Sequence, residues 1–243
     1  MIGILIALAL SWLLLYVFEK KSLLALGWLP VRKRTLQFVL GFCFTALLCV
    51  LAQLLEGFLK ASQWVVHQDS SAAGVLNSVW WDIKSVLTEE LIFRGALLYI
   101  LIKRIGASKA VLISAVAFGI YHWFSYGVLG NVMAMLFVFV GTGLMGYAWA
   151  LAFSKSKSIL LPFGLHLGWN VTYNTVFSKG PLGDLLLVSE GGRAVSEGIS
   201  FLNFSIGMTI IPLLVLLFVV YGVKRNSEKQ NEGASIIQNR RNE

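Results

Sequence analysis

The stretch VWWDIKSVLTEELIFRGALLYILI, residues 79–102, decides the fold. Its length and apolar character fit a helix that crosses a lipid bilayer, which needs about 20 mostly apolar residues. Glu89, Glu90 and Arg94 nevertheless lie inside it, although an ionisable group within a span costs about 2.5–3.5 kcal/mol on insertion scales. Such groups persist when they are buried, paired or functional, so the stretch predicts a membrane fold with a polar site inside it.

The composition of the whole chain agrees with a membrane protein. Its 243 residues are 57% hydrophobic and only 13% charged, whereas a soluble domain has about 25% charged residues. This excludes a soluble globular protein and a disordered chain. The net charge of +8 would favour nucleic-acid binding in a soluble protein. Here the basic residues lie between apolar runs, so we expect no nucleic-acid partner.

Seven apolar runs predict an all-α, polytopic bundle of about seven transmembrane helices. They cover residues 1–18, 35–59, 79–102, 109–127, 130–154, 158–178 and 201–222. The first run lacks a basic start and a cleavage site of small residues, so we expect it to remain as an anchor. We interpret residues 1–223 as a single transmembrane domain and residues 224–243 as a polar cytoplasmic tail, expected to be disordered.

The basic residues alternate between the two sides of these spans. Fifteen of the twenty Lys and Arg residues fall in the loops after the first, third and fifth runs and in the tail. The positive-inside rule therefore puts the N-terminus outside and the C-terminus in the cytoplasm. We expect an integral multi-pass protein of the plasma membrane, with the lipid bilayer as its surroundings.

Two further spans carry polar groups that membrane helices seldom hold. The fourth run contains His122, and the sixth contains His166 and Asn170. A rise of about 1.5 Å per residue puts these side chains and Glu89 within roughly 12–20 Å of one membrane face. If the three helices pack together, the side chains form one polar chamber.

The spacing within each helix indicates which groups can act together. Glu90 and Arg94 are four residues apart on one helix face and can form an ion pair, whereas Glu89 is offset by about 100°. His166 and Asn170 are also four apart and can present a ring and an amide to one point.

Two neighbouring features concern packing. Gly164 and Gly168 flank the histidine of the sixth run, in a pattern of small residues that lets another helix approach closely. Phe118 is one turn before His122 and is expected to pack against it rather than to take part in chemistry.

These residue types fit the activation of a water molecule. A carboxylate in a poorly solvated chamber can act as a general base, and a neighbouring imidazole can share the water or carry the proton. A second imidazole and an amide can donate hydrogen bonds to a developing oxyanion. Glu89, His122 and His166 are also a credible zinc ligand set with water as the fourth ligand. A divalent metal and a metal-free reaction both stay open.

The three motifs resemble those of the CPBP family of intramembrane proteases, which includes the type II CAAX prenyl endopeptidases and the bacteriocin-processing or immunity (Abi) proteins. The family pattern is E-E-x-x-x-R, then F-x-x-x-H, then H-x-x-x-N/D, on separate helices. Residues 89–94, 118–122 and 166–170 match it in full. The resemblance covers residues 79–178, a protease-like core within the single domain.

The resemblance implies a hydrolase, an intramembrane endopeptidase that cuts a peptide or membrane-protein substrate. It implies that Glu89 and His122 activate the water, that His166 and Asn170 stabilise the oxyanion, and that the ion pair of the first motif supports the site. The family is often called metalloprotease, but a metal-free glutamate mechanism is equally compatible with these residues.

Two other functions fit the same residues. In a non-catalytic membrane immunity or scaffold protein, the polar groups would only hold helices together, so function would survive Glu89→Gln and His122→Ala. In a proton-coupled transporter Glu89 would be the relay, although the sequence shows no inverted repeat of the kind common in transporters. The peptidase is the preferred hypothesis, with the non-catalytic protein second.

Overall fold

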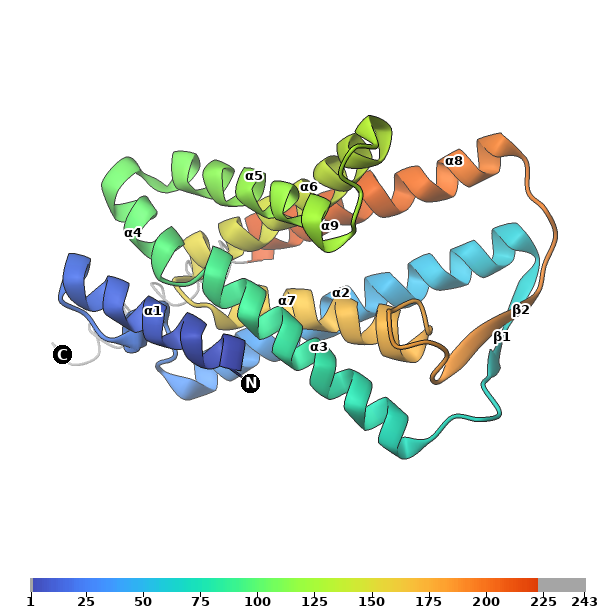
Figure 1. The fold of residues 1–243 in the computed structure, drawn as a ribbon, viewed down its shortest axis with the longest axis horizontal. Coiled ribbons are helices and arrows are strands. Elements are labelled where there is room, and N and C mark those ends of the chain that lie inside the picture. Colours follow the sequence, from blue (N-terminus) through green and yellow to red (C-terminus); the bar gives the residue numbers. More distant parts are fainter. Residues whose placement is uncertain (1, 223–243) are drawn as a thin grey trace, which may run out of the picture.

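The computed structural model describes residues 2–222 and is mostly helical (Figure 1). The predicted tail, residues 224–243, lies outside the described residues. The helices are α1 (Ile2–Glu19), α2 (Val31–Lys60), α3 (Ala72–Phe93), α4 (Ala96–Ile105), α5 (Ala107–Ser125), α6 (Val132–Ser156), α7 (Leu160–Asn170), α8 (Glu197–Ser205) and α9 (Ile211–Leu217).

Short polar side chains begin two of the helices that build the site. The Ser71 hydroxyl accepts a hydrogen bond from the Gly74 amide at the start of α3, at 3.0 Å. The Asn131 side chain accepts one from the Ala134 amide at the start of α6, at 3.1 Å. Each bond satisfies an amide that the helix itself leaves without a partner.

Five helical segments within residues 2–222 are long and apolar enough to cross a membrane. They are α1, α2, α5, α6 and the segment Glu197–Gly222, which contains α8 and α9. This agrees with an integral membrane protein. The predicted runs 79–102 and 158–178 do not reach the same standard, so seven spans and the orientation of the termini stay predictions.

The prediction of one continuous helix over residues 79–102 is wrong. α3 ends at Phe93 and α4 begins at Ala96, so Arg94 and Gly95 lie outside both helices. A Cβ atom at Gly95 would overlap the carbonyl oxygen of Leu91, so the break needs glycine at this position. α3 also holds four charged residues, which explains why it falls short of an apolar span.

The sixth predicted run forms only a short α-helix, α7, followed by a π-turn at Val171–Val176. A Cβ atom at Gly164 or Gly168 would overlap the carbonyl oxygens of Phe38 and Phe42 on α2. The prediction that these glycines admit another helix is confirmed, and α2 is that helix. Figure 1 shows α7 in the centre of the bundle, where it contacts α2, α3 and α6.

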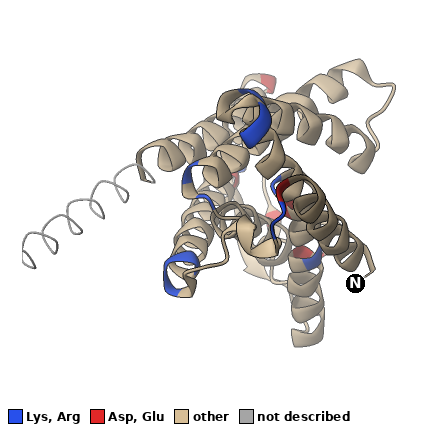
Figure 2. Cartoon of the chain, turned by 90° about the vertical axis from the view of Figure 1, so that its left-hand side faces the viewer, with Lys and Arg blue, Asp and Glu red and all other residues tan. Residues whose placement is uncertain are grey.

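The loops that were predicted to share one side of the membrane gather at one end of the bundle, on the left of Figure 1. Lys103 at the end of α4 pairs with Glu19 at the end of α1. Arg34 in the first turn of α2 donates to the carbonyl oxygen of Ser156 at the end of α6, at 2.8 Å. Figure 2 faces this end and shows its Lys and Arg residues in blue.

A small sheet at the opposite end was not predicted. Strands β1 (Ser62–Val66) and β2 (Leu187–Gly191) pair in antiparallel fashion. The sheet joins the connection between α2 and α3 to the connection before α8. The fold is therefore helical throughout the bundle but is not strictly all-α.

Candidate active site

Glu90, Arg94 and His166 form the buried centre of the site. Glu90 Oε1 lies 3.3 Å from Arg94 Nη1 and 2.9 Å from His166 Nδ1. The side chains of Glu90 and Arg94 are 0% exposed, and that of His166 is 5% exposed. The predicted ion pair at four-residue spacing is confirmed. One carboxylate thus joins the end of α3 to α7.

Glu89 faces the other ring nitrogen of the same histidine. Its Oε2 lies 3.8 Å from His166 Nε2, and its side chain is 13% exposed. Among the described residues, Glu89 Oε2 has no hydrogen-bond partner. Two adjacent carboxylates therefore meet the two nitrogens of one imidazole. Glu90 lies within hydrogen-bond distance of the ring, whereas Glu89 Oε2 is farther from it, at 3.8 Å.

Trp149 on α6 fixes the plane of this imidazole. The indole and the His166 ring are stacked, with centroids 3.8 Å apart and an angle of 18° between their planes. The sequence analysis missed Trp149, because a tryptophan near the end of a predicted span is typical of the membrane interface. Only the packing of α6 against α7 shows that it belongs to the site.

Arg94 lies in an aromatic and carbonyl environment. Its guanidinium carbon is 4.1 Å from the centre of the Phe118 ring, a cation–π geometry. Arg94 Nη2 donates to the carbonyl oxygen of Gly146 on α6, at 3.3 Å. A Cβ atom on Gly146 would lie 2.9 Å from Phe118 Cδ1 and 3.2 Å from Arg94 Nη2. The close fit of these three residues requires glycine at position 146.

His122 on α5 lies beside this centre but is not bonded to it. Its Nδ1 is 2.8 Å from the carbonyl oxygen of Phe118. A carbonyl oxygen can only accept, so Nδ1 carries the proton and Nε2 of the neutral ring is an acceptor. The His122 and Phe118 rings are 4.3 Å apart, as expected, and Phe118 is 6.1 Å from the His166 ring. Phe118 thus lies near both histidine rings and is closer to His122.

Asn170 ends α7 one turn after His166 and is half-buried. Its side chain makes no hydrogen bond within residues 2–222. The residues of the first motif and His166 therefore contact one another directly. His122 is linked to them through the ring of Phe118. Asn170 lies next along the same helix.

The geometry does not favour the predicted metal set of Glu89, His122 and His166. Within residues 2–222, no group of three His, Cys, Asp or Glu side chains is placed to hold one metal ion. This arrangement does not fit a zinc site with three protein ligands. We therefore derive no chemical step through a metal, and the ligand assignment stays a prediction.

A second buried polar group was missed by the sequence analysis. Asp82 on α3 is 0% exposed. Asn174 Nδ2 donates to Asp82 Oδ1 at 2.6 Å, and Thr175 Oγ1 donates to Asp82 Oδ2 at 3.3 Å. Asp82 is an ionisable residue within a predicted span, so the rule that singled out Glu89 also applied to it.

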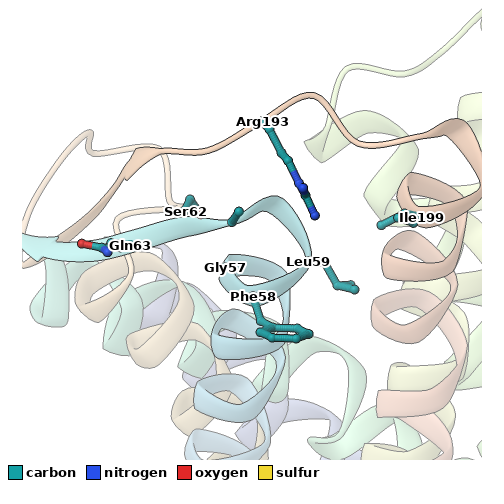
Figure 3. A pocket seen from close by; sticks show the side chains of 8 residues that line it. Gly57, Phe58, Leu59, Ser62, Gln63, Arg193 and Ile199 are labelled. Atoms are coloured by element: carbon teal, nitrogen blue, oxygen red, sulfur yellow. The ribbon is translucent and has the colours of Figure 1, made fainter.

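An open cavity of about 510 Å³ lies away from these residues, at the end of α2 (Figure 3). Phe58, Gln63, Arg193 and Ile199 are among its lining residues, and no residue of the three motifs is. This cavity is therefore separate from the candidate active site.

Comparison with known families supports the identification of the three motifs. Residues 71–172 match the family model described as type II CAAX prenyl endopeptidase Rce1-like. The matched segment contains all three motifs, which confirms the resemblance to the CAAX proteases and suggests an intramembrane peptidase. No curated protein and no solved structure matches the chain.

Proposed function

We propose that this chain is an intramembrane endopeptidase of the CAAX protease type in which Glu89 activates the attacking water. The observation that carries the proposal is the pair of adjacent carboxylates around His166. Glu90 Oε1 is 2.9 Å from one ring nitrogen, and Glu89 Oε2 is 3.8 Å from the other. Glu89 Oε2 and Glu90 Oε2 both lack a hydrogen-bond partner among the described residues. Only the Glu89 side chain is partly exposed, at 13% against 0% for Glu90, so Glu89 is the carboxylate that a water molecule can reach.

The reaction begins with a water molecule bound between Glu89 and His122. Glu89 takes a proton from the water, and the acceptor nitrogen Nε2 of His122 helps to orient it. The water oxygen attacks the carbonyl carbon of the scissile peptide bond, and the electron pair of the C=O bond moves onto the carbonyl oxygen. The electron pair on that oxygen then re-forms the C=O bond as the carbon–nitrogen bond breaks, and the leaving nitrogen takes the proton that Glu89 held.

His166 and Asn170 stabilise the charge that develops on the carbonyl oxygen. His166 donates a hydrogen bond to the oxyanion from Nε2, the ring nitrogen that Glu90 does not contact. The Asn170 amide, four residues later, can donate a second one. Removal of one such donor in other enzymes lowers kcat by about 10²–10³.

Glu90 and Arg94 support the site without touching the substrate. Arg94 lies 3.3 Å from the Glu90 carboxylate, which orients His166 through Nδ1. Trp149 stacks on the same ring at 3.8 Å and prevents it from rotating. The catalytic ring is thus held in place before substrate binds, which is the condition for efficient electrostatic catalysis.

The substrate is a peptide or a membrane protein. A prenylated peptide with a C-terminal CAAX sequence is the first substrate to test, because the matching family model describes prenyl endopeptidases. A leader peptide and a membrane-protein segment are the other two classes. We place the protein in the plasma membrane, with the site nearer to the cytoplasmic side.

The test compares protein and peptide termini in cells that carry the wild type or Glu89→Gln at equal membrane abundance. Glu190→Gln is the matched control, because it makes the same change at an exposed carboxyl on β2. We expect a set of termini that disappears in Glu89→Gln and persists in the control. Identical termini, with a phenotype that Glu89→Gln still supports, would refute the peptidase and favour a non-catalytic immunity or scaffold protein.

A further inference from the structure

A second polar cluster lies along the same two segments as the candidate active site. It consists of Ser78 and Asp82 on α3, and of Asn174 and Thr175 on the π-turn that follows α7. Ser78 and Thr175 are each 1% exposed, and Asp82 is 0% exposed. We call these four residues the Asp82 cluster.

The hydrogen bonds of the Asp82 cluster are all donated toward the Asp82 carboxylate. The Thr175 hydroxyl donates its only hydrogen to Asp82 Oδ2 at 3.3 Å. Since Ser78 Oγ lies 2.8 Å from Thr175 Oγ1, the Ser78 hydroxyl must be the donor of that bond. Asn174 donates to the other carboxylate oxygen at 2.6 Å. Asp82 therefore accepts from two neighbouring residues of the π-turn at once.

The π-turn makes this double contact feasible. The Phe177 amide donates to the Thr172 carbonyl oxygen at 3.0 Å, a bond between residues five apart. In a regular α-helix two adjacent residues point about 100° apart, so they seldom reach the same carboxylate. On this wider turn, Asn174 and Thr175 both reach Asp82 on α3.

The Asp82 cluster and the proposed catalytic groups lie on the same two segments, α3 and the segment formed by α7 and the π-turn. Asp82 is seven residues before Glu89, which puts both on nearly the same face of α3, about 10 Å apart along its axis. On the other element, Asn174 is four residues after Asn170 and eight after His166. The cluster thus joins the same two faces that carry the proposed catalytic groups.

We propose that Asp82 is a positioning residue for the active site. Its carboxylate holds the π-turn against α3 and so fixes the end of α7, with His166 and Asn170, opposite Glu89. No salt bridge within residues 2–222 includes Asp82, so no ion pair competes with this role. The effect on catalysis rests on the proposed peptidase function, whereas the effect on His166 does not.

Two substitutions at this position separate the shape of the side chain from its hydrogen bonds. Asp82→Ala leaves the donors of Asn174 and Thr175 without an acceptor. Asp82→Asn keeps both contacts, because its amide oxygen accepts from Asn174 and its NH₂ group donates to Thr175, whose hydroxyl then turns to Ser78. Asp69→Ala is the control, since Asp69 is exposed and lies outside the cluster.

The first readout is nuclear magnetic resonance of ring nitrogens in protein labelled with ¹⁵N-histidine and purified in detergent micelles. The chain has three histidines, and a His166→Asn variant identifies the signals of His166. We expect Asp82→Ala to shift the Nδ1 and Nε2 signals of His166, and Asp82→Asn and Asp69→Ala to leave them as in the wild type. Unchanged His166 signals in Asp82→Ala would overturn the proposal, whether or not the protein cleaves any substrate.

The second readout is the rate of the Glu89-dependent cleavage. We expect Asp82→Ala to lower kcat at least about tenfold at equal abundance, since a misplacement of about 1 Å can lower a rate by about 10². Asp82→Asn should restore it, and a failure of Asp82→Asn to do so would overturn a role limited to positioning. If Asp82→Ala does not accumulate, Asn174→Ala removes the same contact from the π-turn and must give the same shift of the His166 signals.

Discussion

The adjacent carboxylates Glu89 and Glu90 are expected to respond in opposite ways to the same change. Glu90→Gln removes the negative charge that faces Arg94 at 3.3 Å, where both side chains are 0% exposed. Breaking a buried ion pair by removing one partner costs about 3–5 kcal/mol, because the remaining charge stays buried without compensation. Glu89→Gln changes a side chain that is 13% exposed and lies 3.8 Å from its histidine partner.

The size of the effect follows from the geometry. A loss of 1 kcal/mol lowers Tm by roughly 2–4 °C in a protein of 150–250 residues. Glu90→Gln should therefore lower Tm by about 6–20 °C, and Glu89→Gln should leave Tm within about 2 °C of the wild type. Cleavage should be lost in both variants, but only Glu90→Gln should also lose thermal stability.

The assay is thermal unfolding of purified protein in detergent, followed by tryptophan fluorescence, together with the cleavage measurement at a temperature where each variant is folded. A double variant, Glu90→Gln with Arg94→Met, removes both charges and should recover part of the lost stability. Equal and small changes of Tm in Glu89→Gln and Glu90→Gln would refute the assignment of a structural role to one carboxylate and a chemical role to the other.

The remaining predictions concern packing and the metal. Gly146→Ala should lower the free energy of unfolding by about 1–3 kcal/mol. The added Cβ atom would lie 2.9 Å from Phe118 Cδ1 and 3.2 Å from an Arg94 nitrogen. An unchanged Tm would contradict this packing. Gly168→Val should prevent accumulation in membranes, since a Cβ there overlaps the α2 backbone, whereas Gly3→Ala meets nothing within 4 Å and should be silent; immunoblots of membrane fractions compare the two. Treatment of the purified protein with 1,10-phenanthroline should leave Glu89-dependent cleavage intact, because the described residues hold no three-ligand cluster. Loss of activity that added zinc restores would show that the metal-free reaction is wrong.

Local spacing made several features of the site predictable. The position of ionisable residues in apolar runs identified a membrane protein with an internal polar site. The interval of four residues predicted the Glu90–Arg94 pair, and the glycines around His166 predicted the close approach of a helix. These predictions are confirmed because they depend on the geometry of a single helix, which the chain determines over one or two turns.

Contacts between segments that are far apart in the chain could not be predicted from the sequence. The spacing could not show that Trp149 stacks on His166, or that Gly146 must be small to admit Arg94 and Phe118. The apolar pattern also predicted one span over residues 79–102, whereas the structure breaks this segment into two helices at Gly95.

The sequence by itself thus determined the class of the protein, the residue types of its candidate site and the helix face on which each one lies. The tertiary structure decided which faces meet: Glu90 with His166, Asp82 with the π-turn, and α2 with α7. The physical reason is that helical periodicity sets directions within one helix. The choice of neighbouring helix depends on packing and buried hydrogen bonds between segments that are far apart in the chain.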